Sequence, residues 1–148
     1  MNPEAKLAEL GVDLFDVQPG TGPVQPWVRT GNLLYLSGRV PDSGLKGTVG
    51  KDLTTDEAYQ AARECAIGHL SVAKSALGDL NKIVRVVKVL GMVNAVAGFE
   101  EQPQVINGYS DFIVDVFGDK GRHARSAVGM SSLPHNVPVE VEVILEVE

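Results

Sequence analysis

The chain has 148 residues, enough for one domain with a substantial hydrophobic core. Thirteen basic and nineteen acidic residues give a net charge of −6, so the chain lacks the overall basic character of a typical nucleic-acid binder. Its single cysteine, Cys65, excludes an internal disulfide and argues against a structural zinc site. No apolar run approaches the roughly 18 residues of a membrane span, and the polar N-terminus does not resemble a signal peptide, so we expect a cytoplasmic protein without a membrane partner.

Residues 1–21 are expected to form an N-terminal extension of a helix and a loop. The stretch "PEAKLAELG" places Leu7 and Leu10 on one side of a helix and ends in a glycine stop. The Gly- and Pro-rich stretch "LFDVQPGTGPVQP" that follows predicts an irregular loop. Next, "WVRTGNLLYLSGRV" predicts two short strands joined by a tight hairpin turn at Gly31-Asn32.

Two long helices are predicted downstream, separated by a strand. Thr54 and Glu57 form a capping-box pattern, and residues 56–77 then predict a helix whose small inward side chains let it lie close on a sheet. The stretch "KIVRVVKVLGMV" is β-branched and apolar on both parities, which is typical of a central strand covered on both faces. A second helix is predicted for about 102–117, with one apolar stripe and a glycine at its end.

The closing stretch, "RHARSAVGMSSLPHNVPVEVEVILEVE", predicts two more strands, around 125–130 and 137–147. In the second strand, apolar residues occupy one parity and glutamates the other, interrupted only by Ile144. Alternate side chains of a strand point to opposite faces, so this strand has one apolar and one acidic face. Two interpretations follow: a half-solvated strand, or a strand on which one carboxylate faces an arginine across a site.

The predicted element order is ββ(β)αβαββ, where the third strand is optional. We therefore predict a single α+β domain over residues 1–148, with a mixed sheet and the two main helices packed on one face. No helix remains to cover the other face of the sheet. Because exposed apolar surface of that extent usually marks an interface, a homo-oligomer is expected.

Three stretches resemble the RidA/YjgF family, the reactive intermediate deaminases whose older name is endoribonuclease L-PSP. They are "GNLLYLSGRVP", "VINGYSDFIVDVFG" and, above all, "ARSAVGMSSLPHNVPVEVEVI". The N-terminal helix and the segment "RHARSAVG" are similar to the longer branch of the family, whose fold is chorismate-mutase-like. The resemblance implies a homotrimer in which three sheets pack around a central barrel-like core, with a cleft at each subunit interface.

The resemblance also implies a set of site residues. Arg125 matches the arginine that grips the substrate carboxylate, a task for which its planar, permanently charged fork is suited. Gly38 and Ala127 match positions whose backbone amides add donors, and Asn107 matches a helix asparagine near the cleft. Glu140 matches the glutamate that places or activates water, so Arg125 and Glu140 are the expected catalytic pair.

The implied reaction hydrolyses an enamine or imine of a 2-keto acid to the keto acid and ammonia. Such a substrate is already reactive, so holding its carboxylate and presenting a water suffices, and no metal or cofactor is expected. From the residues alone, Arg125 also fits a structural ion pair on a strand, and Glu140 one of a row of solvated charges.

Two positions depart from the pattern of the deaminase members. Val24 stands where they carry a tyrosine, and Ala127 stands where they carry a cysteine. Trp27 and Tyr35 are candidates to fill the space of the missing tyrosine. A second hypothesis is therefore a non-catalytic protein that binds or senses small carboxylates. A third is the endoribonuclease of the older family name, to which an acidic chain without a basic and aromatic stripe gives little support.

Other polar side chains have simpler interpretations. His123 and His135 fall in predicted loops and are expected to be exposed. His69, on a helix side, is expected to be a satisfied hydrogen-bond partner rather than a base, and Cys65 to be inert core. Arg39 has two open alternatives, lining the cleft or pairing with a glutamate of a neighbouring subunit.

Overall fold

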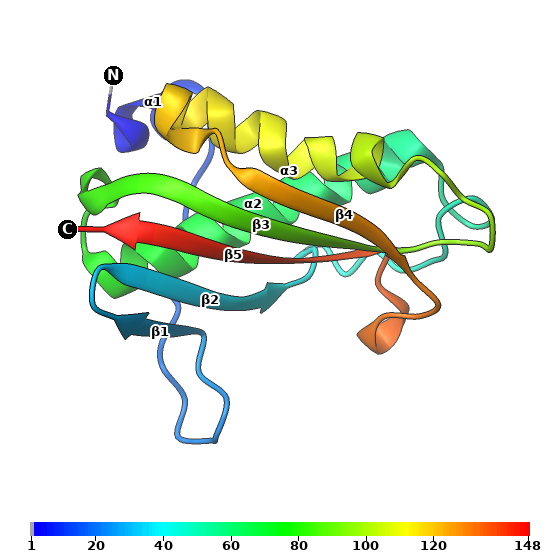
Figure 1. The fold of residues 1–148 in the computed structure, drawn as a ribbon, viewed down its shortest axis with the longest axis horizontal. Helices are drawn as coiled ribbons and strands as arrows, with labels where there is room; N and C mark the ends of the chain where they lie inside the picture. The colour runs from blue at the N-terminus through cyan, green and yellow to red at the C-terminus, as the bar shows by residue number, and fades with distance from the viewer. Residues whose placement is uncertain (1) are drawn as a thin grey trace.

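The computed structural model of the chain describes residues 2–148. Within them a five-stranded sheet forms one layer and helices cover one of its faces (Figure 1). The strand order is β1-β2-β5-β3-β4; β3 and β4 run parallel and the other neighbours antiparallel, so the sheet is mixed, as predicted. The strands are β1 (Trp27–Thr30), β2 (Leu33–Arg39), β3 (Ile83–Asn94), β4 (Ala124–Met130) and β5 (Val139–Val147).

The helices begin and end close to the predicted positions. They are α1 (Pro3–Glu9), α2 (Thr55–Leu77) and α3 (Gln102–Phe117), with short 3-10 turns η1 (Leu80–Lys82), η2 (Gly118–Gly121) and η3 (Pro134–Asn136). The capping box is confirmed: the Thr54 hydroxyl accepts from the Glu57 N–H at 3.1 Å, and the Glu57 carboxylate accepts from the Thr54 N–H at 3.1 Å. Gly78, at φ 79°, ends α2 in the left-handed conformation that glycine tolerates.

Two glycines let α3 lie very close to its neighbours. A Cβ at Gly108 would stand 1.9 Å from the backbone oxygen of Tyr59 on α2. A Cβ at Gly91 on β3 would stand 2.5 Å from Cγ1 of Ile106 on α3. α3 therefore packs closely against α2 at Gly108 and against β3 at Gly91. These contacts position the side chains of α3 that belong to the candidate site.

The two faces of the sheet differ sharply. On β5 the apolar parity is buried beneath the helices, from Val139 to Val147, whereas Glu142 on the other parity is exposed. β3 lies inside the sheet, between β5 and β4, as predicted for a central strand, but helices cover only one of its faces in the single chain. The middle of the sheet is β5, and Val84 on β3 is 37% exposed because both long helices lie on one side.

The optional third strand does not form. Val49 makes only isolated bridges, to Leu53 and Ala95, because the segment that holds it is a glycine-rich loop. Among the helices within residues 2–148, none combines the length and apolar character needed to cross a membrane.

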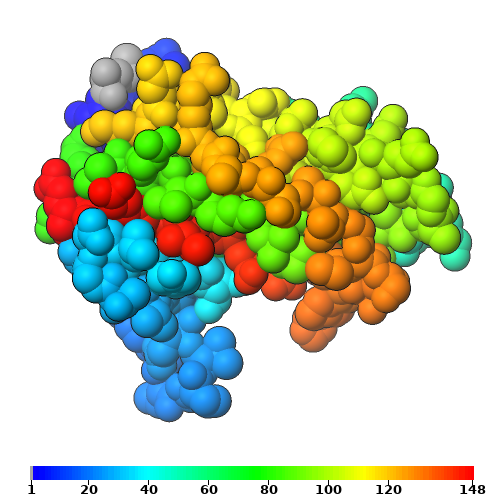
Figure 2. Space-filling view, viewed as in Figure 1, coloured from blue at the N-terminus to red at the C-terminus, as the bar shows by residue number. Residues whose placement is uncertain are grey.

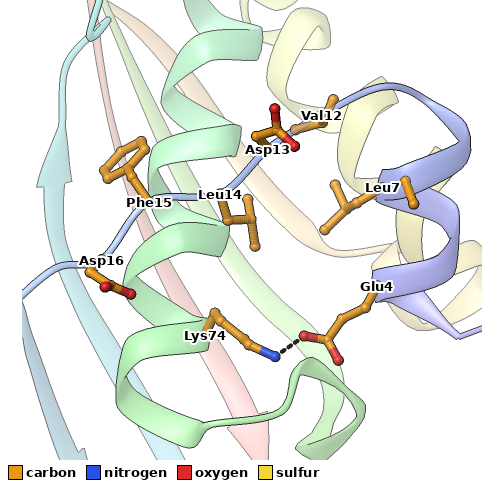
Figure 3. A pocket seen from close by; sticks show the side chains of 9 residues that line it. Glu4, Leu7, Val12, Asp13, Leu14, Phe15, Asp16 and Lys74 are labelled. Carbon is orange, nitrogen blue, oxygen red and sulfur yellow. Dashed lines mark hydrogen bonds and ion pairs between the residues drawn. The ribbon is translucent and has the colours of Figure 1, made fainter.

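The N-terminal extension packs along α2. The N–H groups of Phe15 and Val17 donate to the hydroxyls of Ser71 and Ser75 at 3.2 and 2.9 Å. Between α1, the segment after it and α2 lies a hollow of about 320 Å³, with Lys74 of α2 paired to a carboxylate of α1 at its rim (Figure 3). The expected helix and loop are therefore confirmed, and they contact the helical layer rather than the open sheet face.

Two segments project from one side of the molecule. They are the loop before β1 and the turn after β4, and the surface is hollowed between them (Figure 2). In the ribbon view, β2 ends and β5 begins between these projections (Figure 1). The end of β2 and the start of β5 therefore lie at a concave part of the surface.

Candidate functional site

Arg125 lies on the edge strand β4 and reaches α3. In the sheet register it stands beside Val89, which in turn stands opposite Val143, and both valines are buried under the helices. Arg125 therefore points to the helix-covered face. Its Nη1 donates to Oδ1 of Asn107 at 2.8 Å and to Oγ of Ser110 at 3.1 Å.

These two hydrogen bonds use both protons of Nη1. The hydrogen bonds found within residues 2–148 engage neither Nε nor Nη2 of Arg125. The Nε–Nη2 edge of a guanidinium presents two parallel N–H donors, the geometry that binds a carboxylate through both oxygens. Asn107 and Ser110 thus orient the guanidinium and leave its carboxylate-binding edge available.

His123 extends this network. Its Nδ1 lies 2.6 Å from the carbonyl oxygen of Gly121, and its Nε2 lies 2.9 Å from Oγ of Ser110. A carbonyl only accepts, so Nδ1 carries the proton and Nε2 accepts from the Ser110 hydroxyl. Burial, together with nearby Arg125, lowers the pKa of His123, which favours the neutral ring that this pattern requires.

The prediction of an exposed His123 is wrong. The residue directly precedes β4, and its ring is half-buried because it closes onto α3 through Ser110. His135 is exposed, as predicted, and adopts a positive φ of 58° in the turn before β5.

Glu140, at the start of β5, belongs to the opposite face of the sheet. It stands opposite Met92, and its two neighbours in β5 are buried on the helix side, so its own side chain points to the open face. The carboxylate lies against Gly38: a Cβ there would be 2.1 Å from Oε2. Burial, and then the charge of Glu142, raises the pKa of Glu140 above its ordinary value.

Gly38 sits in an irregular part of β2. The pairing of β2 with β5 slips between Leu36 and Arg39, so two β2 residues, Ser37 and Gly38, bulge out of the regular ladder. A missing side chain at this point lets the Glu140 carboxylate approach the backbone, as the position of the glycine predicts.

The predicted site residues therefore form two groups. Arg125, Asn107 and Ala127 share the helix-covered side near β4, with Ala127 beside Gly91 in the register. Gly38 and Glu140 share the open side. Arg125 and Glu140, expected as a catalytic pair, thus lie on opposite faces of the sheet in one chain.

Arg39 and the aromatic candidates lie elsewhere. Nη2 of Arg39 donates to Oδ1 of Asp42 at 2.8 Å, and its guanidinium lies 5.5 Å from the centroid of the Phe15 ring. Trp27 is half-buried against the core, whereas Tyr35 is 43% exposed on the open sheet face.

The structure adds residues that sequence reasoning did not assign to the site. Ser110 shares a helix face with Asn107 through the i, i+3 spacing, the one signal that could have indicated it.

His69 is fully satisfied by hydrogen bonds, as expected. Cys65 is buried, and burial raises the pKa of its thiol, which fits inert core. Within residues 2–148, no group of three or more His, Cys, Asp or Glu side chains is placed to hold a metal ion.

The sheet order, the helices on one face, and the arginine held by α3 together define an α+β protein of the YjgF type. The chain belongs to the family described as "YjgF/chorismate_mutase-like, putative endoribonuclease", whose model matches residues 4–147. The recognised resemblance is thereby confirmed.

Individual relatives span nearly the full chain. Protein TCP17 of Trypanosoma cruzi is 43% identical over 148 residues, covering 96% of this chain and 92% of the relative. A 2-iminobutanoate/2-iminopropanoate deaminase of Dermatophagoides farinae is 30% identical over 127 residues, covering 86% and 88%. The crystal structure of Atu1372, a protein of unknown function from Agrobacterium tumefaciens, is 46% identical, with a TM-score of 0.91 over 99% of this chain and 93% of that one.

Proposed function

We propose that this protein hydrolyses small 2-imino acids, or their enamine forms, to 2-keto acids and ammonia. The observation that carries the proposal is the orientation of Arg125, whose Nη1 is held by Asn107 and Ser110 while its Nε–Nη2 edge is left for a carboxylate. The named activity of the Dermatophagoides farinae relative supports the choice of reaction.

The proposed sites lie at the interfaces of a homotrimer. Because Arg125 and Glu140 point to opposite faces within one chain, a cleft that uses both takes Arg125 from one copy and Glu140 from the next. The open sheet face also carries a largely apolar hollow of about 340 Å³, with Tyr35, Leu90 and Ile144 among its walls. Packing against further copies would bury this surface.

In the proposed mechanism, Arg125 binds the substrate carboxylate through two N–H groups, and the backbone amides of Gly38 and Ala127 add donors. Glu140 orients a water and accepts one of its protons as the oxygen adds to the C=N carbon. Glu140 passes this proton to nitrogen, which gives a tetrahedral hydroxy-amine. The hydroxyl proton is then transferred to nitrogen, the C=O bond forms as the C–N bond breaks, and ammonia leaves the keto acid. The raised pKa of Glu140 suits a base that works nearer neutral pH.

The first test is hydrolysis of 2-iminobutanoate generated in situ from an amino acid. We expect wild type to release keto acid above the uncatalysed background, and Arg125→Ala and Glu140→Gln each to abolish that excess. Arg122→Ala is the matched control, because Arg122 is largely exposed and pairs with Asp119. Absence of any excess rate in wild type would exclude hydrolysis of this substrate.

A non-catalytic carboxylate-binding protein is the second candidate. It is favoured by Val24, which is 77% exposed and offers no hydroxyl where deaminase members carry a tyrosine, and by Ala127 in place of a cysteine. In that case 2-ketobutanoate would raise the melting temperature of wild type and of Glu140→Gln, but not of Arg125→Ala, and no hydrolysis would accompany binding.

A further inference from the structure

Two buried rings connect the helices to the strand that carries Gly38. His69 of α2 is 1% exposed and Tyr109 of α3 is 0% exposed. Nδ1 of His69 lies 2.8 Å from the Tyr109 hydroxyl oxygen, and Nε2 lies 2.9 Å from the carbonyl oxygen of Ser37. The proposed chemistry uses neither ring, yet both polar ends are fully engaged.

The direction of these hydrogen bonds is fixed. The Ser37 carbonyl only accepts, so Nε2 of His69 carries the proton, and Nδ1 accepts from the Tyr109 hydroxyl. Burial raises the pKa of Tyr109 well above its ordinary value, so its hydroxyl stays protonated. Burial lowers the pKa of His69 to about 4, so the ring stays neutral near pH 7.

The acceptor at the end of this chain belongs to the bulge in β2. Peptide bonds within residues 2–148 are all trans, so the N–H of Gly38 points opposite to the carbonyl of Ser37. That carbonyl points to His69 on the helix side. The Gly38 N–H is therefore turned away from the helices, the direction of the open face on which Glu140 lies.

We propose that the His69–Tyr109 pair is a positioning device for the Ser37–Gly38 peptide, which it holds so that the Gly38 N–H faces the ligand. The carboxylate as that ligand rests on the proposed function, but the orientation of the peptide does not. A regular ladder would fix such a peptide through strand pairing. In the bulge, the ladder is interrupted, and the hydrogen bond from His69 of α2 to the Ser37 carbonyl fixes the orientation of the peptide instead.

The same helix sets both groups of site residues. Tyr109 lies between Asn107 and Ser110, the two residues of α3 that hold Arg125. Through His69, Tyr109 fixes the Gly38 group, while its neighbours fix the arginine group. Both rings are therefore positioning residues that do not touch the substrate.

The test compares four variants by two readouts. His69→Leu removes the donor to Ser37, and His69→Gln restores an N–H of similar reach. Tyr109→Phe removes only the hydroxyl that selects the His69 tautomer. Ser71→Ala is the matched control, because Ser71 is a buried polar residue of α2 whose hydroxyl bonds to Phe15 and Ile67 instead of to β2. The readouts are the amide NMR resonance of Gly38 without ligand and the Kd for 2-ketobutanoate.

We expect His69→Leu to shift the ligand-free Gly38 resonance and to raise Kd about tenfold or more, the effect of misplacing one hydrogen bond to a charged group. His69→Gln should restore both values toward wild type, Tyr109→Phe should give a smaller change of the same kind, and Ser71→Ala should leave both unchanged. A general loss of helix packing would not produce this rescue by glutamine.

An unchanged Gly38 resonance in His69→Leu, or an equal shift in Ser71→Ala, would overturn the proposal. If His69→Leu does not fold, Tyr109→Phe decides in the same way, and an unchanged resonance there overturns it. If wild type shows neither hydrolysis of 2-iminobutanoate nor binding of 2-ketobutanoate, the proposed function fails, whereas the ligand-free resonance still decides whether the pair positions Gly38.

Discussion

Gly38 and Glu140 show how one missing side chain shapes the candidate site. The carboxylate occupies the space where a β-carbon would stand, so the backbone and the proposed water-handling group are in direct contact. Gly38 is not among the glycines with positive φ, so its backbone conformation is open to alanine, and only the lack of space excludes a larger residue.

Gly38→Ala is expected to preserve the fold and to lower the rate of imine hydrolysis at least tenfold. The added methyl would meet Oε2 of Glu140, the far end of a flexible side chain, so the carboxylate moves aside and loses its alignment with the water. Circular dichroism and keto-acid release check this. Gly22→Ala, where nothing lies within 4 Å, is the control, and full activity of Gly38→Ala would contradict the role given to Glu140.

His69 predicts a pH dependence of stability. Its folded-state pKa of about 4 lies below its ordinary value of 6.5, so the unfolded chain takes up the proton first as the pH falls. The stabilisation is complete above about pH 6.5 and is lost between there and about pH 4, amounting to roughly 3 kcal/mol. Urea unfolding of wild type and His69→Gln across this range measures it. A constant difference between the two would contradict the prediction.

At the level of secondary structure, the contact between α2 and α3 decides where the site residues stand. Asn107, Ser110 and Tyr109 all project from α3, and Gly108 among them is the point at which α3 touches the backbone of α2. A displacement of α3 would therefore move the arginine and the His69 network together.

Gly108→Ala is expected to destabilise the protein by about 1–3 kcal/mol or more, because its Cβ would stand 1.9 Å from a backbone oxygen that cannot move alone. Chemical denaturation measures the free energy of unfolding. Activity should fall with it, since α3 carries the partners of Arg125. Stability equal to that of Gly22→Ala would show that the two helices are not locked at this point.

Neighbouring charges on β5 predict a shift in the pH profile of hydrolysis. Glu140 must be ionised to accept a proton, so the rate falls as the pH drops through its pKa, which burial and then Glu142 raise. Glu142→Gln removes the second cause and should move the acid limb to lower pH. Glu148→Gln, at the exposed end of the chain, should not. If the acid limb of Glu142→Gln stayed at the wild-type pH, the protonation of Glu140 would not be what lowers the rate at acid pH.

The open sheet face governs the proposed assembly. Tyr35 of β2, Leu90 of β3 and Ile144 of β5 line one hollow on it, and none of the helices formed by residues 2–148 covers that side (Figure 1). In the proposed cleft, Arg125 and Glu140 come from different copies because they lie on opposite faces of one chain, so the proposed activity depends on this assembly.

Ile144→Glu is expected to convert a trimer into monomers and to abolish hydrolysis, since it places a charge in the apolar hollow that would become buried between copies. Sedimentation equilibrium and keto-acid release test this together. The control is Leu10→Glu, which replaces another exposed apolar side chain with glutamate, at the end of α1 and away from the open sheet face. A wild type that sediments as a monomer would contradict the assembly, and an active monomeric variant would contradict the inter-subunit cleft.

The sequence by itself determined the elements and their order. The capping box at Thr54 and Glu57, the glycine stop at Gly78, and the alternation along β5 are signals between residues close in the chain, so their interpretation needed no tertiary contacts. The motif around Arg125 likewise identified the family, because its residues are contiguous.

Only the tertiary structure decided how the site residues face one another. That Arg125 and Glu140 point to opposite faces depends on strand register, in which a shift of one residue would reverse a side chain. The closing of His123 onto Ser110, and the reach of His69 to Ser37 across 32 residues, depend on how separate segments pack. Such contacts form between groups far apart in the chain, and no local pattern encodes them.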